Sequence, residues 1–325
     1  MARGRPLLKL PIRFCGDTLA GEVSELPNDA WMAHPQQYDG NISVPLVSPG
    51  GAPNHQCFGP MGPTEWLRRC PYILEIMQAL SATWGRCRLM GLEPGAIVPE
   101  HVDIHYYWRT HFRIHIPVVT NPQVEFTCDG TTINMKAGEC WLLDSFFMHS
   151  VANRGTETRV HLVLDTVGSG RLWDLIDGAR DGARDEELLE PGKTEVQSLE
   201  FEQINAPVVM SPWEIKTHVA YIAEWTDVQP GLGEIMAILD RFIMVWAGTW
   251  ASYGPSEQGL PIYARHLDDV RAALSAFDGP RVMMRNGPAL LNSIERFILA
   301  HAIAPAVLQR LRGGSGPALP FRMTG

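Results

Sequence analysis

Three segments of this 325-residue chain alternate polar and apolar residues, and this alternation constrains the fold more than any other feature. They run from His101 to His105, from His111 to Ile116 and from Arg159 to Asp165. Their odd-numbered positions carry histidine, aspartate or arginine, with Val163 as the exception, and their even-numbered positions are all apolar. Because side chains alternate between the two faces of a strand, each segment is expected to place its polar groups on one face.

The residue choice separates these segments from ordinary exposed strands. A single alternating strand usually has one face in the core and the other in water. Six of the eleven histidines, however, fall between His101 and His161, beside aspartate and arginine. The three segments together favour a barrel-like double sheet whose outer faces pack on helices and whose polar interior is a site.

Short strand-like runs with turn signals between them surround the three segments. Asp129-Gly130 separates two such runs and is a strong signal for a two-residue hairpin. Many short strands at this spacing are typical of a sandwich or barrel. The other expected strands span residues 86–92, 124–128, 131–135, 140–143 and 149–152.

The chain changes character near residue 170, which predicts three parts. Residues 1–169 form the β-rich domain with a Pro/Gly-rich N-terminal extension, and residues 170–203 form an acidic linker. Residues 204–325 form an α-helical C-terminal domain, with Ser211-Pro212 as a helix start. Helices are expected over residues 70–83, 213–225, 233–253, 262–277 and 288–311.

His101 and Asp103 place an imidazole and a carboxylate on one side of one strand, and His149 follows next to a strand start. Two histidines and one carboxylate on one face of a metal are the facial triad of non-haem Fe(II) oxygenases, which leaves positions open for substrate and O₂. His-x-Asp alone is common by chance. The pair followed by the distal histidine makes His101, Asp103 and His149 the candidate metal ligands.

Arg159 follows His149 by ten residues, enough for one strand, a turn at Asn153–Gly155 and a return strand. A cosubstrate such as 2-oxoglutarate has a far carboxylate that suits a planar, two-pronged donor. We therefore interpret Arg159 as the residue that holds that carboxylate. The alternative is a salt bridge at the rim of the barrel.

Composition excludes several classes of protein. The net charge of −9 argues against a nucleic-acid-binding protein. The longest nearly uninterrupted apolar stretch, residues 242–251, is about half of the roughly 20 residues that a membrane span needs. The six cysteines form no Cys-x-x-Cys pair, and the N-terminus is a poor secretory signal. We expect a reduced, cytoplasmic protein that contacts neither membrane nor nucleic acid.

Six motifs together resemble the aspartyl/asparaginyl β-hydroxylase family, and the resemblance covers about residues 25–168. The family also includes bacterial enzymes that act on free amino acids, such as the proline cis-4-hydroxylases. The motifs are Leu89-Met90-Gly91-Leu92-Glu93-Pro94-Gly95, Pro99-Glu100-His101-Val102-Asp103, Arg113-Ile114-His115-Ile116-Pro117, Gly138-Glu139-Cys140-Trp141, His149-Ser150-Val151-Ala152-Asn153 and Arg159-Val160-His161-Leu162-Val163-Leu164-Asp165.

The resemblance implies a mixed β and α fold, with a double-stranded β-helix (jelly-roll, cupin-like) core ahead of the C-terminal helical region. It implies Fe(II), 2-oxoglutarate as cosubstrate and O₂. His101, Asp103 and His149 match its metal ligands, and Arg159 matches its clamp on the cosubstrate tail. Arg113 and His115 match an Arg-x-His pair that lines the cosubstrate and substrate side. The resemblance does not assign Arg113 to the carboxylate of the cosubstrate or to that of the substrate.

Two departures bear on the substrate. Animal members of the family have glycine where Asp103 stands, which aligns this chain with the bacterial branch that has the full triad. They also have a serine where this chain has Met90, so their substrate does not transfer simply.

The function predicted is a 2-oxoglutarate-dependent dioxygenase that hydroxylates an unactivated carbon. Its substrate is an amino acid, an amino-acid residue in a peptide or a related small carboxylate. One alternative is a cupin-like metal-binding or isomerase module without oxygen chemistry. Another is a non-catalytic scaffold whose helical C-terminus binds a partner.

The remaining histidines and aromatics have plainer interpretations. His105, His111 and His161 are expected to be hydrogen-bonded barrel residues, while His34 and His55 show no companions that suggest chemistry. The tryptophans and methionines between residues 213 and 250 are expected to be core packing, with a substrate lid or a homodimer face as alternatives.

Overall fold

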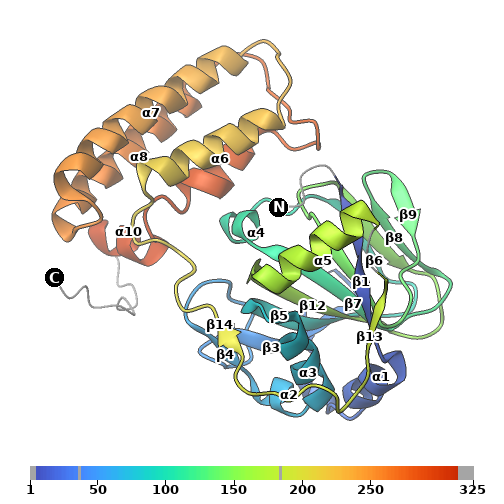
Figure 1. Cartoon of the computed structure of the whole chain (residues 1–325). Helices are drawn as coiled ribbons and strands as arrows, with labels where there is room; N and C mark the ends of the chain where they lie inside the picture. The colour runs from blue at the N-terminus through green and yellow to red at the C-terminus, as the bar shows by residue number, and fades with distance from the viewer. Residues whose placement is uncertain (1–4, 36–37, 183–184, 314–325) are drawn as a thin grey trace. The chain divides into compact units, whose positions relative to one another are not determined.

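The computed structural model describes residues 5–35, 38–182 and 185–313, and these divide into two compact units (Figure 1). The first unit holds the chain up to Asp103 and then Thr110–Asn205. The second unit holds Ile104–Arg109 together with the chain from Ala206 onward. A six-residue segment from the first third of the sequence therefore belongs with the C-terminal helices.

The first unit is a mixed β and α structure built around two sheets. Its helices are α1 (Gly16–Ser24), α2 (Glu65–Arg68), α3 (Pro71–Leu80) and α5 (Gly170–Asp181). Its strands are β1 (Leu7–Phe14), β2 (Met32–Ala33), β3 (Asn41–Pro49), β4 (Met61–Pro63), β5 (Thr83–Leu92), β6 (Ile97–His101), β7 (Phe112–Val119), β8 (Val124–Cys128), β9 (Thr131–Ile133), β10 (Glu139–Leu143), β11 (His149–Asn153), β12 (Arg159–Gly168), β13 (Glu187–Leu189) and β14 (Glu200–Phe201).

The strand order makes a double-stranded β-helix. The large sheet contains the antiparallel run β10-β7-β12-β5, and the small sheet is β6-β11-β8-β9. From β5 to β12 the chain passes back and forth between the two sheets, except at the β8–β9 hairpin. This alternation is the jelly-roll arrangement that the family resemblance implies.

The predicted hairpin at Asp129-Gly130 is confirmed. Cys128 pairs with Thr131, so the loop has two residues. Asp129 has φ 49° and Gly130 has φ 73°. Two positive φ angles are what a type I′ turn requires, and its twist matches the twist of the flanking strands.

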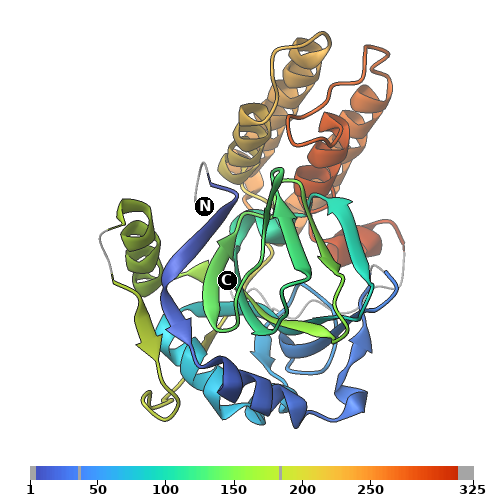
Figure 2. The same cartoon turned by 90° about the vertical axis from the view of Figure 1, so that its right-hand side faces the viewer.

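The two sheets face each other across a core to which both contribute (Figure 2). Leu92 and Leu143 from the large sheet pack with Val98, Phe126 and Val151 from the small one. The outer side of the large sheet is equally buried: α1 contacts β7, and α5 contacts β1. The expectation that the outer faces pack on helices is thereby confirmed for the large sheet. It does not hold for the small sheet, where Ile97 of β6 points away from the core and is 50% exposed.

The N-terminal extension contributes more to the large sheet than the sequence predicted. β1 pairs antiparallel with β10, and β3 pairs antiparallel with β5. In β1, Leu8, Leu10, Ile12 and Phe14 are all buried. This spacing of two is a strand signal that the proline at position 11 obscured.

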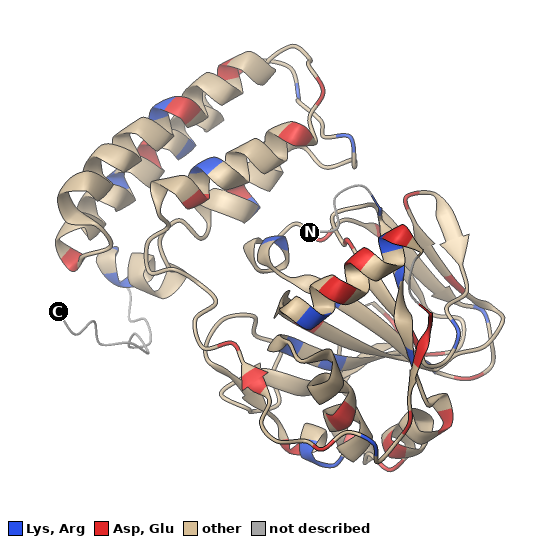
Figure 3. Ribbon diagram, viewed as in Figure 1, with Lys and Arg blue, Asp and Glu red and all other residues tan. Residues whose placement is uncertain are grey.

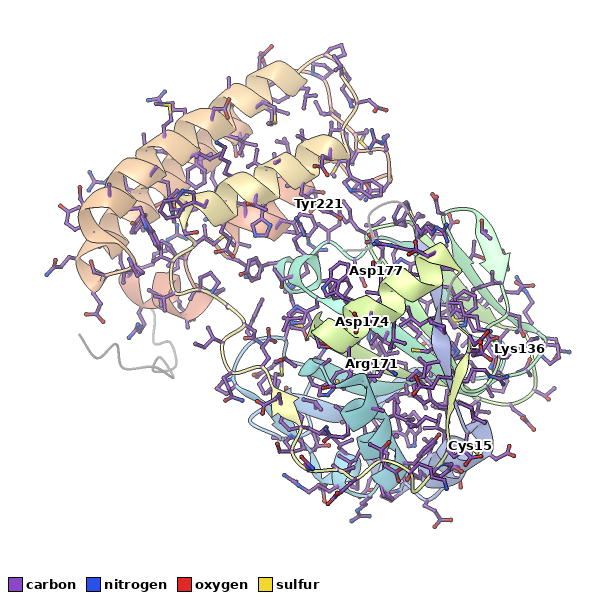
Figure 4. The ribbon with its side chains drawn as sticks, viewed as in Figure 1. Cys15, Lys136, Arg171, Asp174, Asp177 and Tyr221 are labelled. Carbon is purple, nitrogen blue, oxygen red and sulfur yellow. The ribbon has the colours of Figure 1, made fainter. Side chains whose placement is uncertain are left out.

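The prediction of an acidic linker over residues 170–203 is wrong, because this segment is built into the first unit. In α5, Leu172, Leu175 and Ile176 are fully buried, so the helix has one apolar face. Its acidic residues, red in Figure 3, lie on the exposed side of the helix, and Asp174 and Asp177 are labelled in Figure 4. The segment continues as β13, which runs parallel to β1, and as β14, which runs parallel to β5.

The second unit consists of helices. They are α4 (Tyr106–Thr110), whose last residue belongs to the first unit, α6 (Pro212–Glu224), α7 (Leu232–Tyr253), α8 (Leu260–Ser275), α9 (Leu290–Ile294) and α10 (Pro305–Leu311). The single helix expected over residues 288–311 is broken: a π-helical turn follows α9, and Pro305 begins a separate helix. Proline cannot donate a backbone hydrogen bond and is favoured in the first turn of a helix.

Helix α7 is long and apolar enough by composition to cross a membrane, with a mean hydropathy of 1.2 over its best window. Core helices that are mostly buried pass the same test. In α7, Ile235, Leu239, Phe242 and Trp246 are buried, but only 28% of the apolar window is. One such helix is weak evidence, so the expected absence of membrane contact stays a prediction. The homodimer through the C-terminal helices also stays a prediction.

The segment Ile104–Arg109 is held in the second unit by specific side-chain contacts. The Tyr106 hydroxyl donates to Glu214 Oε1 at 2.6 Å. The Arg109 guanidinium lies 3.8 Å from the ring centre of Tyr221, which is labelled in Figure 4. His105, expected in the barrel, instead contacts His301 edge to face, with ring centres 4.9 Å apart.

We predict that Tyr72→Phe destabilises the first unit. The Tyr72 hydroxyl donates to the carbonyl of Leu189 in β13 and accepts from the backbone N–H of Cys15 at 2.8 Å. The substitution leaves both buried groups without this partner, which costs about 1–3 kcal/mol. Urea unfolding followed by circular dichroism measures the change in the free energy of unfolding.

Tyr253→Phe is the matched control, because Tyr253 is 41% exposed. We expect it to change the free energy of unfolding by less than about 0.5 kcal/mol. Equal effects of the two substitutions would contradict the bridging role of Tyr72.

Candidate metal centre

The structure brings together the three residues that the sequence singled out as metal ligands. His101, Asp103 and His149 each offer a ligand atom, and these atoms lie within 4.8 Å of one another. His101 and His149 are directly paired across β6 and β11, with ring centres 4.2 Å apart. Asp103 follows β6, and its backbone N–H donates to the Ser145 carbonyl at 3.0 Å.

Backbone contacts orient both imidazoles. His101 Nδ1 lies 2.8 Å from the Pro99 carbonyl oxygen, and His149 Nδ1 lies 2.9 Å from that of Phe147. Each Nδ1 can only donate to a carbonyl, so in the neutral rings the lone pair is on Nε2. Metal-binding histidines are usually held in this way through their second nitrogen.

The two oxygens of Asp103 have different roles. Oδ2 accepts from Arg113 Nη1 at 2.6 Å, whereas Oδ1 lies on the side of His101, 3.9 Å from Nε2. Arg113 also donates from Nε to Asp165 Oδ1 at 2.9 Å. One oxygen of Asp103 is therefore committed to Arg113, which leaves the other to face a cation.

The protonation states suit a metal site. Burial alone would raise the pKa of Asp103, but the Arg113 guanidinium and the two histidines outweigh it and hold the pKa below the ordinary range. Burial lowers the pKa of His149 to about 4. A carboxylate and a neutral imidazole are the forms that bind a metal. The residues present fit a divalent ion such as Fe(II).

Arg159 is the clearest unsatisfied charge in the barrel. It is 4% exposed, its Nε has no hydrogen-bond partner, and it forms no ion pair with any described residue. Burial lowers the pKa of Arg159 to about 9. A buried charge without a counterion is costly, so this guanidinium is suited to an incoming carboxylate.

His115 and His161 lie near Arg159 and share its lack of partners. Both are buried, and neither ring nitrogen of either residue has a hydrogen bond to the described part of the chain. Their ring centres are 5.8 Å apart. His161 was expected to be a hydrogen-bonded barrel residue, and the lack of a hydrogen bond contradicts that expectation. His111 does match that expectation, since Nε2 lies 3.1 Å from Glu202 Oε2.

A basic group on β5 was not expected from the sequence. Arg86 and Arg88 are both buried, and Arg88 Nη1 lies 3.3 Å from His34 Nε2. Burial, with repulsion from Arg86 and Arg113, lowers the pKa of Arg88 to about 9. The prediction that His34 has no chemical companion is wrong. The sequence contained a signal for this group. Arg86 and Arg88 alternate with the apolar Cys87, as polar and apolar residues do in the three segments analysed above.

We predict that Arg113→Met both destabilises the protein and weakens metal binding. The substitution removes the cation from two buried carboxylates, Asp103 and Asp165, which costs about 3–5 kcal/mol. Loss of the group that orients Asp103 is expected to weaken Mn(II) binding by about 10–100-fold. Urea unfolding and calorimetric Mn(II) titration measure the two effects.

Arg154→Met is the control, because Arg154 also donates to a carboxylate, Glu125, but 61% of its side chain is exposed. Exposed ion pairs contribute about 0–1 kcal/mol, so little change is expected. Unchanged Mn(II) affinity in folded Arg113→Met would show that Arg113 does not orient Asp103.

The free energy of unfolding is expected to fall in acid. Burial, with repulsion from Arg88 and Arg86, lowers the pKa of His34 to about 3, and burial lowers the pKa of His301 to about 4. An unfolded histidine titrates near 6.5, so below that pH the unfolded chain binds more protons than the folded one. These contributions are complete above about pH 6.5 and are lost as the pH falls toward the folded pKa values.

The urea midpoint of the metal-free protein at pH 7.5 and pH 5 measures this loss. We expect a lower midpoint at pH 5 and a smaller difference in His34→Gln. The same pH dependence in His34→Gln and the wild type would rule out the contribution of His34.

Comparison with known proteins gives a family match over the jelly-roll region. Residues 61–168 match the family described as Aspartyl/Asparaginyl beta-hydroxylase. L-proline cis-3-hydroxylase 1 of a Streptomyces species is 25% identical over 162 residues, which cover 47% of this chain and 52% of the relative. The chain thus matches about half the length of this curated relative.

Two solved structures are similar to part of this chain. A prolyl-4-hydroxylase from Pseudomonas putida is 12% identical, with a TM-score of 0.34, and the match covers 51% of this chain and 95% of that one. An oxidoreductase of the 2OG-Fe(II) oxygenase family from Burkholderia pseudomallei is 13% identical, with a TM-score of 0.33. The match covers 48% of this chain and 80% of that one.

Proposed function

Residues 61–168 belong to the aspartyl/asparaginyl β-hydroxylase family, and from that premise we propose that this protein is an Fe(II)- and 2-oxoglutarate-dependent dioxygenase. It hydroxylates an unactivated carbon of a free amino acid or a related small carboxylate. The observation that carries the proposal is the cluster of His101, Asp103 and His149 within 4.8 Å, in the same barrel as the unpaired Arg159.

Each of these residues has a defined task. His101, Asp103 and His149 would hold Fe(II), and Arg113 keeps Asp103 ionised and oriented. Arg159 binds the distal carboxylate of 2-oxoglutarate, and the predicted neighbour His115 lies on the same side of the large sheet. When bound, Fe(II) and 2-oxoglutarate supply the activation of O₂, with succinate and CO₂ as the coproducts. The protein supplies position and exclusion of water.

The basic group on β5 supports a substrate with its own carboxylate. The barrel holds four buried arginines, Arg86, Arg88, Arg113 and Arg159. Arg113 is paired with Asp103 and Asp165, and Arg86 Nε lies 3.9 Å from Asp165 Oδ2.

Arg88 has no carboxylate within ion-pair distance among the described residues, and its side chain contacts His34 instead. We assign Arg88 to the substrate carboxylate and Arg159 to the cosubstrate. This leaves Arg113 to orient Asp103, although the sequence motifs had grouped it with the residues around the cosubstrate.

A screen for substrate-stimulated succinate formation tests the proposal. The purified protein with Fe(II), 2-oxoglutarate and O₂ is offered the twenty amino acids, with proline first because the Streptomyces relative is named for it. A parallel panel contains peptides with the same residues. We expect a free amino acid to raise succinate formation, and His101→Ala to abolish that rise.

Arg88→Met separates the substrate from the cosubstrate. We expect it to raise the KM for the amino acid at least tenfold and to leave the KM for the cosubstrate within about twofold, since the loss of one charged hydrogen bond costs about 1.5–3 kcal/mol. Stimulation by peptides alone would contradict a free-carboxylate substrate.

The alternative is a cupin-like metal-binding or isomerase module without oxygen chemistry. It leaves the buried, unpaired Arg159 without a role. Anaerobic titration of 2-oxoglutarate into the Fe(II) protein distinguishes the two, because chelation of Fe(II) by the cosubstrate gives a weak visible charge-transfer band. Metal binding without this band would favour the module.

We propose a reducing, cytoplasmic setting for this activity. All six cysteines are free, and Cys70, Cys87, Cys128 and Cys140 are buried. Burial raises the pKa of Cys70 and Cys128 to about 12, so these thiols are inert.

A further inference from the structure

His161 is a buried polar side chain whose place in the fold calls for a partner. It lies on β12, two residues after Arg159, and is 1% exposed. Neither ring nitrogen has a hydrogen-bond partner among the described residues. A neutral imidazole always carries one N–H, so His161 presents a buried donor without an acceptor, which is costly.

The neighbouring strands cannot satisfy this donor. His161 is paired with Pro117 on β7 and with Met90 on β5. Side chains that pair across neighbouring strands lie on the same face of the sheet, so these two flank the imidazole. Proline has no polar side-chain atom, and the methionine sulfur is only a weak acceptor. The nearby His115 ring has both nitrogens unpaired as well, so the two histidines are not bonded to each other.

Arg159 and His161 point to the same side of β12, because they are two residues apart in a strand. We propose that His161 donates an N–H to the carboxylate that Arg159 binds, and so is a second recognition residue for the distal carboxylate of 2-oxoglutarate. This inference rests on the proposed function and assigns a residue to its cosubstrate site.

The electrostatics agree with a neutral donor. Burial, with repulsion from Arg159 and His115, holds the pKa of His161 well below its usual range. The ring thus adds a directed hydrogen bond beside the guanidinium without adding a second buried positive charge. A carboxylate has several lone pairs and can accept from both groups at once.

The test compares two ligands in protein loaded with Mn(II), so that no turnover is involved. 2-Oxoglutarate has the distal carboxylate, whereas 2-oxobutyrate has the same keto-acid head without it. Calorimetry gives the Kd for each ligand with the wild type, with His161→Phe, which keeps a planar ring but has no donor, and with His161→Gln, which keeps an N–H donor.

We expect His161→Phe to weaken 2-oxoglutarate binding at least tenfold and to change the affinity for 2-oxobutyrate by less than twofold. His161→Gln should recover most of the affinity for 2-oxoglutarate. His161→Leu takes the place of the phenylalanine variant if that protein does not fold.

Three results would overturn the inference. Unchanged 2-oxoglutarate affinity in the variants without a donor would show that His161 does not contact the cosubstrate. An equal loss for both ligands would show that it only supports packing. Wild-type protein that binds Mn(II) but not 2-oxoglutarate would overturn the proposed function, and this assignment with it.

Discussion

The buried bridge from Asp103 through Arg113 to Asp165 is the interaction on which the candidate site depends. Arg113 lies on β7 and Asp165 on the paired strand β12, where the two residues are directly opposite each other. Asp103 lies outside the sheets, at the start of the connection that leads from β6 to β7. The guanidinium therefore ties this loop residue to the rigid large sheet. A metal-binding carboxylate needs such support, because the position of a loop residue is otherwise weakly determined.

The buried arginines of the barrel differ in whether a carboxylate of the protein pairs with them. Arg113 is neutralised by carboxylates of the protein, whereas Arg88 and Arg159 are buried without one among the described residues. Burying such charges lowers stability unless a ligand supplies the counterion. Buried arginines without a counterion are therefore typical of a binding site, because apolar side chains at the same positions would make the protein more stable. The two guanidiniums are the basis on which we propose two carboxylate ligands, the cosubstrate at Arg159 and the substrate at Arg88.

A short segment of the second unit lies in the sequence between two residues of the candidate site, Asp103 and Arg113. Residues 104–109 leave the first unit directly after Asp103 and return to it before Arg113. Within the second unit, Tyr106 is held by Glu214 and Arg109 by Tyr221. The chain therefore enters this segment directly after Asp103 and reaches Arg113 four residues after leaving it.

The sequence by itself determined which residues share a face, because side-chain direction alternates locally along any strand. That rule placed Arg159 and His161 on one face of β12, and the turn at Asp129-Gly130 needed only its own two residues. Asp103 was selected by the His-x-Asp pattern, although β6 ends at His101 and the strand expected over residues 101–105 does not form. Tertiary structure decided which faces meet. The partner of Arg113, the pairing of Arg88 with His34 and the docking of residues 170–203 depend on strand register and on contacts between distant segments. No local pattern contains this information, since register is set by packing of the whole barrel.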